Sequence, residues 1–189
     1  TYIYDPNVEA YSTDYHKERA YRSYFVVCCV PTPEGPDGHV DLSILDSTVE
    51  YWSKNHHKDG IFVIKSTIPS GTTEKYCKQY NANRIVHNPE FLTERTHMAD
   101  FRNPSDVVVG GAQEIAEEVG ALYEWYYNDI KVDVDINICS AKEAELVKTV
   151  RNSFYATKVI FMNEIYQFCD KLGIDYQQYE KILTNNHKH

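Results

Sequence analysis

The sequence predicts an α/β protein built on a Rossmann-like parallel sheet, and two observations lead to this fold class. Short runs that are apolar throughout, such as YFVVCCV and IFVI, alternate with longer segments of helical periodicity. From residue 141 the pattern becomes one apolar stripe at steps of three, four and seven, which is typical of a single long helix. We therefore expect a sheet domain over residues 1–138 and the start of a helical domain over residues 139–189.

The strands are expected where apolar runs stop at turn residues. Residues 1–4 alternate and then meet Asp5-Pro6, as the tail of a strand does. Four further runs are expected to be strands, with a possible fifth after them. They are YFVVCCVPTP (24–33), IFVIKST (61–67), RIVHNP (84–89), DVVVGG (106–111) and IKVDVD (130–135).

Helices are expected between these strands. Asp41 is placed to cap a helix over residues 42–52, and Ser70 or Thr72 is placed to cap a second helix up to residue 80. A third helix is predicted over about residues 112–127, and the long helix follows over 141–172 without proline or glycine before Gly173. At 1.5 Å per residue the last helix is roughly 45 Å long, too long for a crossover in a compact α/β unit.

Bulk properties narrow the class of protein. The chain has 189 residues and a net charge of -9, and an acidic surface argues against nucleic acid as a partner. The longest apolar run, residues 25–30, is too short to cross a membrane. Five cysteines without a CxxC pair suggest a reduced, cytoplasmic protein.

Histidine is frequent, but its spacing does not suggest a metal site. His56 and His57 lie in a polar loop, and HKH closes the chain at residues 187–189. Neither group has the helical HxxxH spacing of zinc ligands, so no metal is expected.

Three of the predicted strands end in polar motifs. VPTP, KSTIP and HNPE each follow an apolar run directly. In parallel sheets ligands bind beyond the carboxyl ends of the strands, so these motifs mark the expected site. Within them, the hydroxyl of Thr67 is placed to reach a ligand, although a simple turn residue would look the same.

Two pairs of residues at helical spacing are candidates for chemistry. Glu90 and Glu94 would present both carboxylates on one side if the chain becomes helical after Pro89. Lys148 and Asn152 would present an ammonium and an amide as donors to an oxyanion. Taken alone, each pair is better explained as solvated helix surface.

The motifs in their order are more specific than any one of them. Asp5, VPTP, KSTIPSGTT, NPEFLTE, DFRNPSDVVVGG and AELVKTVRNSF follow one another at sensible intervals. This set resembles the UDP-glucose/GDP-mannose dehydrogenase family of nucleotide-sugar 6-dehydrogenases, from about residue 5 to residue 176. The resemblance implies oxidation of the sugar 6-alcohol to a carboxylate with two NAD, through a thiohemiacetal and a thioester on a cysteine.

The resemblance also implies roles for particular residues. Asp5 would hold the adenosine ribose of NAD, and Glu94 would lie near the nicotinamide ribose. Thr67 would contact NAD and position the catalytic water, and Glu90 would act as acid and base in thioester hydrolysis. Lys148 and Asn152 would stabilise the oxyanion. Further contacts are implied for NAD at Val30, Pro31, Thr32 and Ser66, and for the sugar nucleotide at Glu90, Phe91, Leu92, Thr93, Glu94, Lys148 and Asn152.

The chain departs from the family pattern at both ends. It contains no GxGxxG turn, so the first βαβ element of the fold is missing. None of its five cysteines has the GG-C-FPKD context of the family's nucleophile. We therefore expect an incomplete and inactive portion of a larger enzyme that forms a homodimer through residues 141–172.

Three alternatives stay open at this point. The chain could be an inactive remnant that serves as a binding or dimerisation module, or the substrate could be a UDP-hexosamine or GDP-mannose in place of UDP-glucose. A third, weaker alternative is another two-domain dehydrogenase, such as one for 3-hydroxyacids, although NPEFL-E argues against it.

Overall fold

The structure is a computed structural model that describes residues 1–184, so the predicted HKH segment lies outside the described residues. The chain divides into two compact units, the first ending at Lys148 and the second beginning at Thr149. The boundary falls inside one long helix, α6 (Ala141–Leu172). The predicted long helix is thus confirmed at its expected bounds.

The first unit is built on a five-stranded sheet in the order β1-β2-β3-β4-β5. β1, β2 and β3 run parallel, β4 meets β3 antiparallel through His87 and Gly110, and β5 is parallel to β4. The mostly parallel α/β sheet confirms the predicted fold class. The strands are β1 (Phe25–Cys28), β2 (Ile61–Ile64), β3 (Ile85–His87), β4 (Asp106–Gly110) and β5 (Asp135–Cys139).

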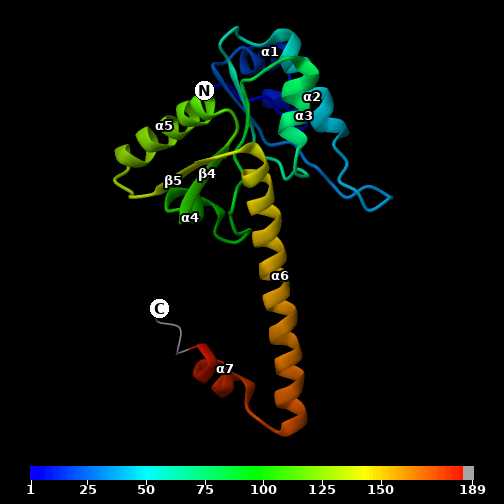
Figure 1. The fold of residues 1–189 in the computed structure, drawn as a ribbon, viewed down its shortest axis with the longest axis vertical. Coiled ribbons are helices and arrows are strands. Elements are labelled where there is room, and N and C mark those ends of the chain that lie inside the picture. The colour runs from blue at the N-terminus through cyan, green and yellow to red at the C-terminus, as the bar shows by residue number, and fades with distance from the viewer. Residues whose placement is uncertain (185–189) are drawn as a thin grey trace. The chain divides into compact units, whose positions relative to one another are not determined.

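Helices cover both faces of this sheet (Figure 1). One core cluster joins α1, α2 and α3 to the sheet around Leu45, Trp52 and Phe62, and a second joins α5 to the other face around Val86 and Val109. The helices of the unit are the short 3-10 helix η1 (Glu9–Tyr11), α1 (Asp14–Tyr21), α2 (Ser43–Asn55), α3 (Thr72–Tyr80), α4 (His97–Arg102), α5 (Gln113–Asp129) and the start of α6.

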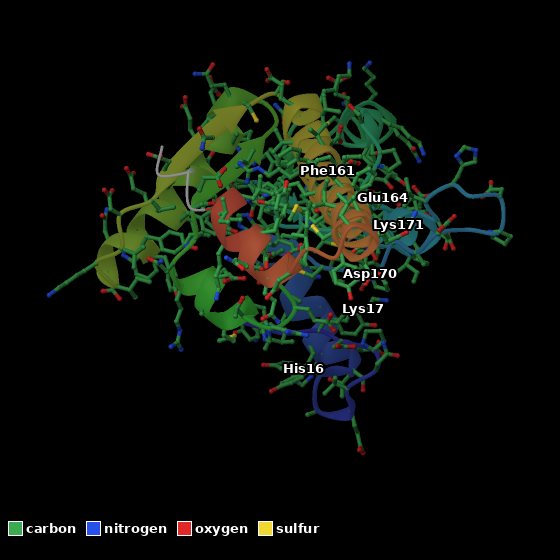
Figure 2. The ribbon with its side chains drawn as sticks, turned by 90° about the horizontal axis from the view of Figure 1, so that it is seen from below. His16, Lys17, Phe161, Glu164, Asp170 and Lys171 are labelled. Atoms are coloured by element: carbon green, nitrogen blue, oxygen red, sulfur yellow. The ribbon has the colours of Figure 1, made fainter. Side chains whose placement is uncertain are left out.

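Two strand predictions were wrong. Residues 1–4 form no strand: β1 is the outermost strand of the described sheet, and residues 1–4 do not pair with it. Instead the ring of Tyr4 packs on Tyr21. The ammonium of Lys17, which is labelled in Figure 2, lies 5.9 Å from the centroid of the Tyr4 ring. IKVDVD is not the fifth strand either. Lys131 takes a left-handed φ of 58° and Val132 donates to the Tyr127 carbonyl, so this stretch closes α5, and the strand begins at Asp135.

The predicted cap of α3 was also wrong. Its N-cap is Gly71, with a φ of 93°, and Thr72 turns its hydroxyl to the Pro69 carbonyl. The fully buried carboxylate of Glu145 instead accepts from the amides of Gly71 (2.5 Å) and Thr73 (2.8 Å). A carboxylate at a helix N-terminus satisfies amides that have no partner within the helix.

The second unit consists of the rest of α6 and α7 (Tyr176–Thr184). α6 ends at Leu172, Gly173 follows it with a φ of 67°, and the amide of Ile174 donates to the Cys169 carbonyl. Large apolar side chains along α6 are exposed, and Phe161 lies on the side of the helix opposite Asp170 (Figure 2). None of the helices within residues 1–184 is long and apolar enough to cross a membrane.

Candidate active site

The polar motifs lie together at the carboxyl ends of the parallel strands, as predicted. Because β1, β2 and β3 run parallel, the segments that follow them begin at the same edge. The hydroxyl of Ser66 donates to the Val30 carbonyl (2.5 Å), and the hydroxyl of Thr32 donates to the Thr67 carbonyl (2.8 Å). VPTP and KST therefore form one connected surface of small side chains.

The predicted cofactor residues on this surface differ in exposure. Thr67 and Pro31 are exposed, Val30 and Thr32 are half-buried, and Ser66 is buried. The hydroxyl of Ser66 is bonded to the Val30 carbonyl of the neighbouring loop. Among the predicted cofactor residues, Ser66 is therefore the least available to contact a ligand. Thr67, to which the resemblance gives a contact with NAD, is thus an exposed residue of this surface.

The NPEFLTE segment is not helical at Glu90. Residues 88–93 are irregular, a turn follows, and α4 begins only at His97, because Pro89 removes an amide and favours an extended residue before it. The helical spacing of Glu90 and Glu94 therefore does not exist in the structure. Glu94 is exposed, and its predicted role near the nicotinamide ribose stays a prediction.

Glu90 and Lys148 form an ion pair at this edge. The ammonium of Lys148 donates to the carboxylate of Glu90 (3.0 Å) and to its backbone carbonyl (2.6 Å). Lys148 is 7% exposed, while the carboxylate is about one-third exposed. Because a nearly buried ammonium has few water partners, this contact supplies its counter-charge.

The environment of Glu90 favours its ionised form. Partial burial alone would raise the pKa of Glu90, but the hydrogen bond from Lys148, the amide of Leu92 (3.0 Å) and the positive charges of Lys148 and Lys65 lower it below its ordinary value. A carboxylate that stays ionised while partly withdrawn from water can accept a proton.

A second basic group, Lys65, lies next to this segment. Its ammonium donates to the side-chain oxygen of Asn88 (2.8 Å) and lies 3.3 Å from the Asn88 carbonyl and 3.5 Å from the Tyr123 hydroxyl. The hydroxyl of Tyr123 donates to the same side-chain oxygen (2.5 Å), and the amide group of Asn88 donates to the Val108 carbonyl (2.7 Å). Burial lowers the pKa of Lys65.

A cavity of about 300 Å³ adjoins this network. It lies among the segment after β3, α4, the first residues of β4 and α5, and it includes three of the predicted substrate residues together with Glu90. The lining includes Lys65, Asn88, Glu90, Phe91, Leu92, Thr93, Phe101, Asp106, Tyr123 and Tyr127. The segment predicted to bind the sugar nucleotide thus forms one wall of a polar and aromatic hollow.

Asp5 and Asn152 are the two remaining predicted site residues. The carboxylate of Asp5 accepts from the amide of Asn7 (2.9 Å) in a local turn. Asn152 is exposed and belongs to the second unit. Their roles toward NAD and the oxyanion stay predictions.

The sequence reasoning missed Lys65, Asn88, Tyr123 and Glu145. Lys65 and Asn88 stand inside the quoted motifs KSTIP and HNPE, so their place at strand ends was visible. The partners of each lie 23 to 74 residues away along the chain, and no local pattern connects them.

Within the described residues, no three His, Cys, Asp or Glu side chains are grouped closely enough to hold a metal ion. His56 stacks on Trp52 with ring centroids 4.4 Å apart, and His57 accepts from the amide of Asp59 (3.2 Å). All five cysteines, which lie in this part of the chain, are free thiols.

Comparisons with known proteins agree with this arrangement. The profile of the UDP-glucose/GDP-mannose dehydrogenase family, NAD binding domain, matches residues 7–131, and that of the family's central domain matches residues 142–188. The first match confirms NAD as the predicted cofactor. It begins two residues after Asp5, which is therefore outside the matched region.

Individual relatives point to the same family. The UDP-glucose 6-dehydrogenase of Rickettsia bellii is 31% identical over 173 residues, covering 89% of this chain and 39% of the relative. An uncharacterised protein of Methanocaldococcus jannaschii is 36% identical over 162 residues, covering 79% of this chain and 17% of that protein. The chain therefore spans less than half the length of these relatives.

A solved structure shows the same fold. The crystal structure of a GDP-mannose dehydrogenase ternary complex from Pseudomonas aeruginosa matches with a TM-score of 0.80 and 25% identity, covering 99% of this chain and 47% of that one. With more than half of its residues matched by the NAD-binding domain profile, the chain belongs to the UDP-glucose/GDP-mannose dehydrogenase family.

Proposed function

We propose that this chain is part of an NAD-dependent nucleotide-sugar 6-dehydrogenase that oxidises UDP-glucose to UDP-glucuronate. The observation that carries the proposal is the pair formed by Glu90 and the nearly buried Lys148 at the carboxyl edge of the sheet. The choice of UDP-glucose rests on the relatives that carry that name, such as the one from Rickettsia bellii.

In the proposed reaction Glu90 and Lys148 have complementary tasks. Glu90, held ionised, accepts a proton from the water that cleaves the acyl intermediate. An ammonium has three N–H donors, and Lys148 directs two of them to Glu90. Its remaining donor is assigned to the substrate oxygen on which negative charge develops, with Asn152 as a second donor.

The described residues fit one half of NAD better than the other. NAD supplies the acceptor for hydride when it is bound, and Thr32, Thr67 and Glu94 would contact its nicotinamide end. The small side chains that follow β1 and β2 and are at least partly exposed support this assignment. The sequence contains no GxGxxG turn, so these residues supply no glycine-rich cradle for the pyrophosphate.

The nucleophile of the reaction is assigned to a cysteine outside this chain. Burial raises the pKa of Cys28 to about 12, and burial also raises the pKa values of Cys29, Cys77 and Cys139. Cys169 is buried in the second unit. The thiolate is the form of cysteine that attacks an aldehyde, and a thiol with a raised pKa forms little thiolate near neutral pH.

We propose further that the enzyme is cytoplasmic, and that it forms a homodimer through α6. Five free cysteines support a reducing compartment. The exposed apolar stripe of α6 supports association with a second copy. The boundary between the sheet domain and the helical domain is proposed near residue 139, where β5 ends and α6 begins.

The test is NADH formation by the protein made from the complete reading frame, supplied with UDP-glucose and NAD. We expect two NADH per UDP-glucuronate, and a loss of about 100-fold or more in kcat for Lys148→Met, because an oxyanion donor is removed. Turnover of GDP-mannose or a UDP-hexosamine alone would correct the substrate. If the frame yields no NADH with any of these sugars while the chain still binds NAD, it is the inactive binding module.

A further inference from the structure

We infer that Lys65 is a positioning residue for Glu90: through Asn88 it fixes the backbone from which Glu90 extends, and its charge acts on the Glu90 carboxylate. This inference rests on the proposed function only in taking Glu90 as the proton acceptor. Lys65 was assigned no role by its motif, and its ammonium is directed into the protein and not toward the surface formed by VPTP and KST.

The first step of the argument concerns the backbone around Pro89. β3 ends at His87, where it shares a single residue pair with β4. Proline has no amide to continue the strand pairing, so residues 88–90 need other anchors. Two lysines provide them: Lys65 reaches the Asn88 carbonyl (3.3 Å) and Lys148 reaches the Glu90 carbonyl (2.6 Å). The two ammonium groups thus hold the backbone on either side of Pro89.

The second step concerns Asn88, which connects Lys65 to the sheet. Its backbone amide donates to Ile64 of β2 (2.9 Å), and its side-chain amide donates to Val108 of β4 (2.7 Å). Its side-chain oxygen receives both Lys65 and Tyr123. Asn88 is 1% exposed, so each of these bonds is made away from water, where an unmet polar group is costly.

The third step concerns charge. Burial lowers the pKa of Lys65, the charge of Glu90 acts to raise it, and the charge of Lys148 acts to lower it. The groups that act on Glu90 are Lys148 from α6, Lys65 from the end of β2 and the amide of Leu92. A neutral side chain at position 65 would therefore remove both an anchor of Asn88 and one of the two cations that favour ionised Glu90.

The test is the titration of Glu90 in the 189-residue chain, without NAD or sugar nucleotide. The carboxyl carbon of Glu90 and the amide of Leu92, which donates to that carboxylate at 3.0 Å, are followed by NMR against pH. We expect the titration midpoint to shift upward in Lys65→Met and in Lys65→Gln, and to stay near that of the unsubstituted chain in Lys65→Arg. Gln keeps a donor for buried Asn88, so it decides the question if Met prevents folding.

Lys75→Met is the matched control, since Lys75 is an exposed lysine of α3 whose removal should leave the midpoint unchanged. A folded Lys65→Met or Lys65→Gln chain with an unchanged midpoint would overturn the inference and leave Lys65 a purely structural residue. An equal shift in Lys75→Met would overturn it too, because any lost positive charge would then suffice. The absence of NADH formation would refute the proposed function without altering these midpoints.

Discussion

The pairing of Glu90 with Lys148 is a residue-scale feature whose strength depends on unequal burial. The ammonium is almost enclosed, while the carboxylate is partly in water, so solvent screens the carboxylate more. Removing the carboxylate leaves a buried cation without its counter-charge, whereas removing both charges leaves no such defect.

We therefore expect Glu90→Gln to lower the free energy of unfolding by about 2 kcal/mol, and the double variant Glu90→Gln/Lys148→Met to lose less than the sum of the single variants. Urea unfolding at neutral pH measures both. Glu50→Gln, which breaks an exposed pair with Lys54, is the control and should leave stability nearly unchanged. Additive losses in the double variant would show that the pair contributes no coupling.

His87 is a second residue with a measurable consequence. It is fully buried, and among the described residues neither of its ring nitrogens has a hydrogen-bond partner. Burial lowers the pKa of His87 to about 4, and the positive charges of Lys65 and Lys148 add to the effect. The folded chain therefore binds a proton at His87 only below about pH 4, while the unfolded chain binds one there below about pH 6.5.

Between these two pH values the unfolded state binds a proton at His87 that the folded state does not bind, so the free energy of unfolding falls as the pH falls. Between pH 7 and pH 5 we expect a loss of about 2 kcal/mol from this group. Urea unfolding at the two pH values measures the loss, and in His87→Leu it should be smaller by that amount. Equal losses in both chains would mean that His87 binds its proton equally in the folded and unfolded states.

At the scale of elements, Glu145 joins the start of α6 to the start of α3. Its carboxylate satisfies two amides of α3, and Lys148 follows one turn later on the same helix. Gly110 supports the same junction: a Cβ there would lie 2.5 Å from the Cβ of Ala144, so only glycine lets α6 begin this close to β4. The position of Lys148 therefore depends on contacts that involve neither Glu90 nor a ligand.

We expect Glu145→Ala to lower the free energy of unfolding by about 3 kcal/mol, because the amides of Gly71 and Thr73 lose a charged acceptor. Thermal and urea unfolding measure the change. Glu143→Ala, two residues earlier on α6, is the matched control: the Glu143 carboxylate accepts from exposed Ser140, and its removal should cost much less. A similar loss in both variants would show that the general stability of the α6 start matters, and not the bonds to α3.

These element-scale contacts also show how far the sequence could predict the structure. The apolar runs predicted β1 to β4, and the glycine after Leu172 predicted the end of α6. The motifs at the strand ends predicted that the site lies at the carboxyl end of the parallel strands. IKVDVD misled because alternation does not distinguish a strand from a helix end that closes through Lys131. The bonds of Lys65 and Glu145 were out of reach because their partners are distant along the chain.

At the scale of the whole molecule, the second unit has an exposed apolar surface on α6, where the sequence predicted an apolar stripe. Phe154, Phe161 and Phe168 follow one another at intervals of seven residues on α6 and are each exposed by more than half. Seven residues are close to two helical turns, so these rings lie along one side of the helix. Exposed aromatic rows of this kind are typical of association surfaces.

If this row is the proposed dimer surface, the chain should sediment with twice its mass of 21.9 kDa at micromolar concentration. Phe161→Glu places a charge in the middle of the row, and we expect it to give the monomer mass with unchanged helix content by circular dichroism. Asp170→Lys alters the opposite side of α6 and should leave the dimer intact. A monomer for the unsubstituted chain would refute association through this helix alone, and a dimer that survives Phe161→Glu but not Asp170→Lys would place the contact on the other side of α6.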